Sequence, residues 1–414
     1  MESYYLDWAN LLLRWVHVIT AIAWIGASFY FVMLDNSLEK PHDQESLDKG
    51  VGGEQWAVHG GGFYNMQKYA LAPKKLPDHL HWSYWESYST WLSGFALFTM
   101  SYLWNASTYL IDKSKMDWQP GAAISVALAF FVVFWIAYDC ICQIFGRRKN
   151  GDTIVGVLVA LLVAFAAWLA CQWFAGRAAF LLVGAMMATT MSGNVFFWII
   201  PGQRENVAAL REGKPVNPAH GIRGKQRSVH NTYFTLPVLF AMLSNHYSFT
   251  YMHEHNWIVL LLIMLGGAAI RQFFVVRHRF KLGNAKNPLP YAMAGIAVLG
   301  FGAQADVAVR SAQITPSRAA IGEKVVLAFE VVNRSAAPQR VLVDFRIHYT
   351  KANGSTAAKV FKLKTLELQA GETARLQKSV SLAQMSTRTH YPGRHQVDAL
   401  LNGHAQPLGH FDLA

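Results

Sequence analysis

The stretch that decides the fold runs from Trp8 to Leu34 and reads WANLLLRWVHVITAIAWIGASFYFVML. It is long enough to cross a bilayer, because a helix of about 20 apolar residues spans the hydrocarbon layer. One helical face of this stretch carries a polar and aromatic stripe, at Arg14, His17, Trp24 and Ser28. Ionisable groups at membrane depth are costly and normally face other helices or a cavity. This face is therefore predicted to point into a bundle of helices.

The composition favours a membrane protein with a soluble appendage over a purely soluble enzyme. Of the 414 residues, 53% are hydrophobic and 15% are charged, whereas about 25% are charged in an average soluble domain. The net charge is +12, but Lys and Arg in short loops set the topology of membrane proteins, so no nucleic-acid partner is expected. The three cysteines form no disulfide or zinc motif, and C-x-x-C-H is absent, so no covalent c-type haem is expected in this chain.

Seven further apolar stretches predict a mainly α, polytopic membrane protein with about eight transmembrane helices. They lie near residues 83–104, 121–145, 153–174, 178–200, 233–250, 257–276 and 289–306. The loops 146–152, 201–232 and 277–290 are basic, whereas the intervening loops 105–120, 175–177 and 251–256 are short and carry little positive charge. The positive-inside rule then predicts an N terminus outside the membrane and basic loops in the cytoplasm.

From about Ala308 the sequence pattern changes from long apolar runs to alternation. Segments such as VVLAFEVVN (325–333) and QRVLVDFRIHYT (339–350) alternate apolar and polar residues, and turn signals such as Asn353-Gly354 separate them. This pattern predicts a small all-β domain, an Ig-like sandwich. The predicted domains are therefore a membrane domain at 1–306 and a β-sandwich domain at 307–414, which eight spans would place outside the membrane.

Two histidines within the predicted spans form a candidate cofactor site. With the orientation above, His17 and His246 lie in the outer parts of the first and sixth spans. Two imidazoles from facing helices are the usual axial ligands of a b-type haem, so the pair could hold haem b. The alternative is that each histidine is a hydrogen-bonded packing residue. Near the cytoplasmic end, Asp139 and Arg271 are predicted to form a buried ion pair, and the alternative is a role in proton transfer or substrate binding.

The cytoplasmic side contains a candidate anion site. His59 precedes three glycines, so backbone N–H groups could approach a ligand closely there. His59 belongs to a long loop at 35–82, and a second long loop at 201–232, which leads into the sixth span, adds cations and polar groups at Arg204, Arg223, Lys225, Arg227, His230 and Asn231. Guanidinium groups suit planar oxyanions. The cations and Asn231 are predicted to bind substrate, with His59 or His230 as general base. The alternative is that the cations only retain the loop in the cytoplasm.

Several long segments resemble the integral-membrane, cytochrome-c-coupled urate oxidase family over roughly residues 1–306. They include LLLRWVHVITAIAWIGASFYFVMLDNSL (11–38), GGEQWAVHGGGFYNMQKY (52–69) and NPAHGIRGKQRSVHNTYFTLPVLFAMLSNHY (217–247). The resemblance implies an eight-helix domain in a bacterial inner membrane. It also implies oxidation of urate to 5-hydroxyisourate in purine catabolism, with electrons passing to cytochrome c.

The C-terminal region departs from this family, whose typical members end in a periplasmic cytochrome c domain. The segment VLVDFRIHYTKANGSTAAKVFKLKTLEL (341–368) instead resembles the small β-sandwich appended to some HEAT-repeat DNA alkylation repair proteins. A separate cytochrome c would then be needed as electron acceptor, and the expected partners are urate, this cytochrome and the lipid bilayer. Two alternatives are a b-type cytochrome that does not act on urate and an anion or urate transporter.

Overall fold

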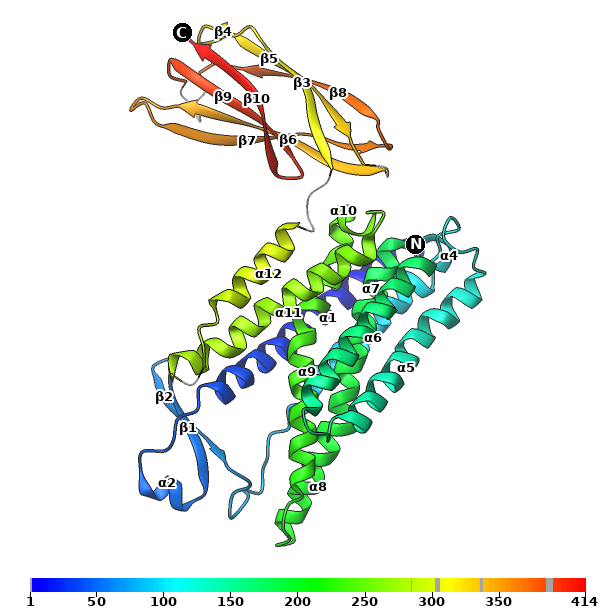
Figure 1. Ribbon diagram of the computed structural model, residues 1–414, viewed down its shortest axis with the longest axis vertical. Helices are drawn as coiled ribbons and strands as arrows, with labels where there is room; N and C mark the ends of the chain where they lie inside the picture. The colour runs from blue at the N-terminus through cyan, green and yellow to red at the C-terminus, as the bar shows by residue number, and fades with distance from the viewer. Residues whose placement is uncertain (1, 284, 302–305, 336–337, 385–389) are drawn as a thin grey trace. The chain divides into compact units, whose positions relative to one another are not determined.

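The computed structural model describes residues 2–283, 285–301, 306–335, 338–384 and 390–414. The protein is mainly helical with a C-terminal all-β domain (Figure 1). The chain divides into two compact units, one of residues 1–246 with 260–299 and one of residues 247–259 with 300–414.

Long helices make up most of the first unit. They are α1 (Glu2–Asn36), α3 (Trp85–Phe98), α5 (Pro120–Phe145), α6 (Gly151–Trp173), α7 (Gly176–Gly193), α8 (Ile200–Arg211), α9 (Pro218–Leu243), α11 (Asn256–Lys281) and α12 (Leu289–Phe301). Shorter segments connect or extend them: α2 (Gln44–Asp48), α4 (Ala106–Tyr109), the π-helical η1 (Thr99–Leu103) and η2 (Asn194–Ile199), and the 3₁₀-helical η3 (Ser244–His246). The short helix α10 (Ser248–Tyr251) belongs to the second unit.

Within the part of the chain that the structure describes, five helices are long and apolar enough to cross a membrane. They cover Tyr4–Asn36, Pro120–Phe145, Gly151–Trp173, Gly176–Arg211 and Asn256–Lys281. Side chains such as Val132, Val133 and Leu161 are exposed on their outer faces, as expected for surfaces that contact lipid. The other three predicted spans correspond to α3 with η1, the second half of α9, and α12.

Helix α7 lies at the centre of the packing, and small residues let it approach α9 closely. A Cβ atom on Gly184 would collide with Cβ of Ala241 on α9. Small residues allow this close approach where helices pack within a membrane, because the driving force there is van der Waals contact. This packing fixes the position of α9, which carries Arg227, His230 and Asn231.

The loop predicted at residues 201–232 is largely helical, which corrects the sequence-based interpretation. Helix α8 and the first half of α9 occupy it. Asn217 caps α9 by accepting a hydrogen bond from the backbone N–H of Ala219 at 3.0 Å, and Pro218 occupies the first turn. Asn at the N-cap and Pro directly after it are favourable helix starts. The cations of this region therefore have fixed helical positions.

The segment 35–82, predicted as a long cytoplasmic loop after the first span, contains a β-hairpin. Strands β1 (Val51–His59) and β2 (Gly62–Tyr69) pair in antiparallel register. Gly60 and Gly61 connect them with φ angles of +58° and +82°. A two-residue hairpin turn of this kind requires positive φ at both central residues. The glycines after His59 are thus explained by the turn itself.

The C-terminal domain is a sandwich of two sheets. Strands β3 (Val307–Thr315), β5 (Lys324–Asn333) and β8 (Thr373–Ser381) form one sheet in the order β3-β5-β8. The other has the order β4-β10-β9-β6-β7, with β4 (Arg318–Ala319), β6 (Gln339–Thr350), β7 (Thr356–Leu368), β9 (Gly393–Leu401) and β10 (His404–Leu413). Alternate residues enter a shared core that includes Phe329, Phe345 and Phe411.

One polar cluster joins β6 to β9 in this domain. Arg346 donates hydrogen bonds of 3.0 and 2.7 Å to Oδ2 of Asp398, and Nε2 of His348 lies 2.9 Å from the same oxygen. Partial burial opposes ionisation of Asp398, but the hydrogen bonds and charges of His348 and Arg346 outweigh it. The pKa of Asp398 is therefore lower than that of an exposed aspartate.

Candidate functional site

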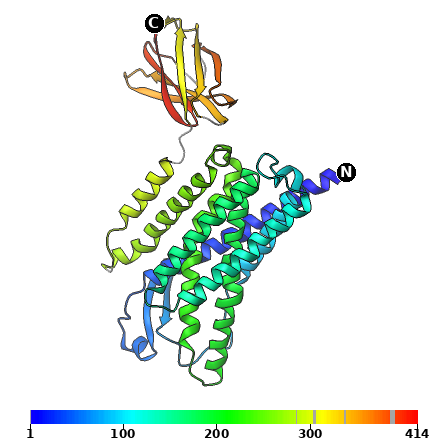
Figure 2. The same cartoon turned by 45° about the vertical axis from the view of Figure 1, so that its right-hand side comes forward.

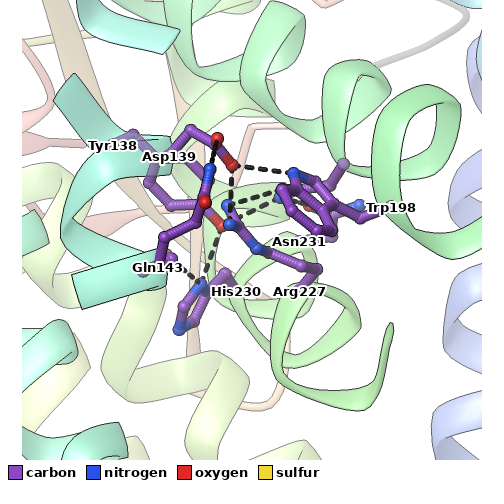
Figure 3. Close-up of polar contacts among 9 residues, drawn as sticks. Tyr138, Asp139, Gln143, Trp198, Arg227, His230 and Asn231 are labelled. Atoms are coloured by element: carbon purple, nitrogen blue, oxygen red, sulfur yellow. Dashed lines mark hydrogen bonds and ion pairs between the residues drawn. The ribbon is translucent and has the colours of Figure 1, made fainter. Parts of the chain in front are cut away.

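Polar side chains from α5, η2 and α9 converge within the helical unit (Figure 3). We call this group the Arg227 cluster; its members are Tyr138, Asp139, Gln143, Asn194, Trp198, Arg227, His230 and Asn231. Asn194 and Trp198 belong to the π-helical segment η2. Single π-helical turns occur frequently at functional sites, because the wider turn redirects side chains and frees backbone groups.

A buried ion pair anchors the cluster. Nη2 of Arg227 lies 2.6 Å from Oδ1 of Asp139, and the Arg227 side chain is 4% exposed. The same carboxylate accepts hydrogen bonds from Nε1 of Trp198 at 2.7 Å and from the amide of Gln143. The guanidinium also lies 5.0 Å from the centre of the Tyr138 ring. The charge of Arg227 is thus compensated within the protein.

The hydrogen bonds of the cluster have a defined direction. A guanidinium group can only donate, so the Asn194 oxygen accepts from Nη1 of Arg227 at 3.3 Å. The Asn194 nitrogen therefore donates, to the Tyr138 hydroxyl and to Oδ1 of Asn231, at 2.9 Å each. The Tyr138 hydroxyl also lies 2.7 Å from Nδ1 of His230, within hydrogen-bond distance.

Asn231 connects this cluster to a cavity of about 400 Å³, which we call the Asn231 cavity. Its walls include Trp24, Phe31, Asp35, Trp82, Glu86, Ser87, Gln203 and Ser228. Small-molecule sites commonly have volumes of about 300–1,000 Å³ and combine aromatic walls with a few polar groups. The buried Ser87 hydroxyl has no hydrogen-bond partner among the described residues. The cavity therefore has the size and polarity of a small-molecule site.

The polar groups of the cavity suit a flat heterocycle that carries both N–H and C=O groups. The carboxylates of Glu86 and Asp35 can accept hydrogen bonds from N–H groups, and the amides of Gln203 and Asn231 can donate to carbonyl oxygens. Oδ1 of Asn231 is already occupied by Asn194, and its nitrogen already donates to the Met191 carbonyl at 3.0 Å. The second hydrogen of that amide is left for a ligand.

The structure brings together three of the residues predicted to form the anion site. Arg227, His230 and Asn231 belong to one hydrogen-bonded network. Arg223 lies beside it, with its guanidinium carbon 5.5 Å from the centre of the Trp198 ring. His230 and Asn231 follow Arg227 on α9 by three and four residues, and residues at this spacing share a helical face.

The other predicted residues of the anion site lie elsewhere in the helical unit. The guanidinium of Arg204 on α8 lies over the Tyr84 ring at 5.9 Å. Lys225 lines a separate cavity with Asp35 and Arg279. His59 is exposed at the end of β1. A substrate or catalytic role for these residues stays a prediction.

His17 and His246 have surroundings of different kinds. Nδ1 of His17 lies 3.1 Å from the Ser93 hydroxyl on α3, and a Cβ atom on Gly94 would approach the His17 ring to 2.8 Å. His17 therefore packs directly against α3, as in the alternative interpretation. His246 lies in η3, after the end of α9, and is exposed. Haem b ligation by His17 and His246 stays a prediction.

The predicted ion pair between Asp139 and Arg271 is wrong. Asp139 pairs with Arg227, because α9 starts early enough to place Arg227 on a helix beside α5. The Arg271 guanidinium instead lies 3.8 Å from the centre of the Phe29 ring. Its Nε and Nη2 atoms are buried without a hydrogen-bond partner in the described parts of the chain.

Sequence reasoning missed Tyr138, Asn194 and Trp198, and the whole Asn231 cavity. A usable signal existed for one of them, since Asn194 is the only amide within the predicted span 178–200. A lone amide in an apolar span normally has a buried partner. Tyr138 and Trp198 give no such signal, because aromatic residues are common in membrane helices.

Comparisons with known proteins divide the chain at its C-terminal domain. Residues 3–302 match the family described as urate oxidase N-terminal. Residues 308–414 match the C-terminal Ig-like domain of the uncharacterised protein YhaZ. YhaZ of Bacillus subtilis is 28% identical over 108 residues, which are 26% of this chain and 30% of that protein. The chain thus spans less than a third of the length of this curated relative.

Solved structures give weaker similarities. The alkylpurine DNA glycosylase AlkC of Pseudomonas fluorescens, bound to DNA containing an abasic site analog, is 17% identical with a TM-score of 0.27. That alignment covers 69% of this chain and 97% of AlkC. A β-glucosidase from Listeria innocua is 13% identical over 26% of this chain and 16% of the glucosidase, with a TM-score of 0.23. At these TM-scores neither structure bears on the function of this chain.

Proposed function

Because this chain belongs to the urate oxidase N-terminal family, we propose that it is a membrane-bound enzyme that oxidises urate to 5-hydroxyisourate. A separate cytochrome c accepts the electrons. The observation that carries the proposal is the Asn231 cavity, which lies within the family region and adjoins the Arg227 cluster. Its volume and its mixture of carboxylate, amide and aromatic groups match a small planar purine.

Urate fits this cavity through its edge and its faces. The purine edge alternates N–H donors with carbonyl acceptors, which complements the Glu86 carboxylate and the Asn231 and Gln203 amides. Trp24 and Trp82 offer aromatic surface for stacking on the ring. The Arg227 cluster keeps Asn231 in one orientation, so the polar part of the site is preorganised.

The proposed reaction removes two electrons from urate and adds water. The water oxygen bonds to C5 of the purine, two protons are released, and each electron reduces one oxidised cytochrome c. Glu86 is the candidate general base for the water, because its partly buried carboxylate lines the cavity and forms no ion pair among the described residues. His230 acts through Tyr138 and Asn194, which hold Asn231, and is therefore a positioning residue.

The proposal places this reaction in a bacterial inner membrane. Five helices meet the length and hydropathy required of a span, and α3 with η1, α9 and α12 complete eight crossings. The basic loops then lie in the cytoplasm, with the N terminus and the β-sandwich in the periplasm. Under this topology the Asn231 cavity opens near the cytoplasmic end of α1, where Asp35 lies.

The test is urate-dependent reduction of cytochrome c by the purified full-length protein in lipid nanodiscs, with 5-hydroxyisourate measured by its absorbance. Glu86→Gln is expected to lower kcat by at least about 100-fold, the usual contribution of a general base. Asn231→Ala should raise KM and lower kcat. Matched controls are Glu205→Gln, an exposed acid on α8, and Gln226→Ala, which faces Asp152 rather than the cavity.

Two outcomes would contradict the proposal. One is a wild-type protein that shows no urate-dependent reduction while a family member with its own cytochrome domain does. The other is full activity in both cavity variants. Urate uptake into proteoliposomes without product would instead indicate a transporter.

A further inference from the structure

A second polar cavity lies at the other end of the helical unit, remote from the Asn231 cavity. Its volume is about 700 Å³, and α1 contributes Leu6, Asn10 and Arg14 to it. The Asn231 cavity uses α1 residues from Trp24 onward. Both views show the N terminus and the end of α8 at opposite ends of the helices (Figures 1 and 2). We call this second space the Arg14 cavity.

Two arginines give the Arg14 cavity an excess of positive charge. Arg14 from α1 and Arg177 from α7 both line it, against the single carboxylate of Asp7. Nε of Arg14 donates to Asn10, and Nε of Arg177 donates to Asn245 at 3.1 Å. Across the described parts of the chain, neither arginine forms an ion pair with a carboxylate. Their terminal nitrogens are therefore available to an anion.

The remaining walls make the cavity amphipathic. Leu6, Leu13 and Met100 form an apolar side. Trp104 and Tyr109 also line the cavity, and Trp104 is 78% exposed. Trp and Tyr are enriched at the level of lipid headgroups, where one end of the ring is apolar and the other is wet. The π-helical η1 contributes Met100, Ser101 and Tyr102 to the lining.

We propose that the Arg14 cavity binds an anionic phospholipid. The phosphate lies between Arg14 and Arg177, where guanidinium donors match phosphate oxygens in geometry and charge. An acyl chain follows the apolar side formed by Leu6, Leu13 and Met100. A free phosphate would satisfy the two guanidinium groups equally well but would leave this apolar side uncovered. The proposal does not depend on urate oxidation.

The bound lipid would tie α1 to the rest of the helical unit. Helix α1 packs chiefly on α3, and many of its apolar side chains are exposed, including Leu11, Trp15 and Ile22. A phosphate bridged by Arg14 on α1 and Arg177 on α7 joins two helices that share few direct contacts.

Native mass spectrometry of the delipidated full-length protein tests the proposal, with phosphatidylglycerol, phosphatidylcholine and inorganic phosphate as probes. Phosphatidylglycerol is expected to bind in preference to phosphatidylcholine. Arg14→Gln and Arg177→Gln should each weaken it about tenfold, the effect of losing one charged hydrogen-bonding partner. Arg14→Lys removes the same side chain but keeps a positive charge, so it should retain most of the phosphatidylglycerol binding. Retained binding in this variant would show that the loss in Arg14→Gln comes from the missing charge and not from misfolding.

Lys113→Gln is the matched control, because Lys113 is an exposed cation in the loop that follows α4. Equal weakening in this variant would show non-specific attraction of headgroups and overturn the proposal. Equal binding of both lipids would overturn it as well. Displacement of phosphatidylglycerol by inorganic phosphate alone would support the two-arginine site but reject its assignment to a lipid. Urate turnover in the Arg14 variants reports separately on the proposed enzyme.

Discussion

Removing the carboxylate of Asp139 should destabilise the helical unit strongly, and removing its partner as well should restore much of the loss. Asp139→Ala leaves the Arg227 guanidinium buried without its counter-charge, and the N–H group of Trp198 loses its acceptor. Breaking a buried ion pair on one side typically destabilises a protein by about 3–5 kcal/mol.

The structure indicates the lower end of that range. Arg227 keeps its bond to Asn194 at 3.3 Å, and its guanidinium lies 5.0 and 5.3 Å from the centres of the Tyr138 and Trp198 rings. Asp139 is also 17% exposed, so water can reach the site. We therefore expect a loss of about 3 kcal/mol, or roughly a 100-fold change in the unfolding equilibrium. In Asp139→Leu/Arg227→Met, apolar groups of similar volume replace the pair, and stability should return to within about 1 kcal/mol of wild type.

The assay is unfolding of the purified protein in mixed micelles with a rising fraction of denaturing detergent, followed by tryptophan fluorescence. Glu205→Ala is the matched control. Its partner is His220 at 2.8 Å, but the Glu205 side chain is 67% exposed, so the change should stay below about 0.5 kcal/mol. If Asp139→Ala and Asp139→Leu/Arg227→Met lose the same free energy of unfolding, the reasoning is refuted. The loss in the single variant would then not come from an unpaired Arg227 charge. The double variant should still lack urate-oxidising activity, because it has no Arg227 guanidinium. Asn194 loses this hydrogen-bond donor, and Asn231 is held by Asn194.

Three further predictions concern packing, capping and pH. Gly184→Ala should lower the free energy of unfolding by about 1–3 kcal/mol in the same assay because it overpacks the contact with Ala241, whereas Gly156→Ala, with open space around it, should not destabilise. Asn217→Ala should cost about 1 kcal/mol by removing the N-cap of α9, again measured by detergent unfolding. The lowered pKa of Asp398 means that its stabilisation of the β-sandwich is complete above the unfolded pKa of about 3.9 and is lost as the pH falls through the folded value. Proteolysis of the sandwich in the full chain should therefore increase at low pH, and Asp398→Asn should flatten that dependence.

Long local patterns made the fold predictable. The apolar length of Trp8–Leu34 and the alternation in residues 325–333 are signals contained within single elements, and both gave the correct type of structure. The resemblance to the urate oxidase family is confirmed by the match over residues 3–302. The same reasoning failed for residues 201–232, where charged and small residues masked a helix that its N-cap and tertiary packing stabilise.

The site was less predictable because its contacts join distant parts of the chain. Asp139 and Arg227 are 88 residues apart, and the choice between Arg227 and Arg271 depends on where α9 begins and how it is rotated. His59 shows a different difficulty. Three glycines after a histidine fit an anion-binding loop and a hairpin turn equally well, and only the pairing of β1 with β2 identifies the turn.

Asn231 gives the clearest reason to treat the Arg227 cluster and the Asn231 cavity as one functional unit. A structural ion pair needs only Asp139 and Arg227, yet the hydrogen bonds continue from Arg227 through Asn194 to an amide that faces the cavity. Each bond along this path fixes the donor and acceptor of the next. A protein that needed only packing could fill these positions with apolar residues at similar stability. The polar path therefore makes most sense as a device that presents one defined amide edge to a ligand.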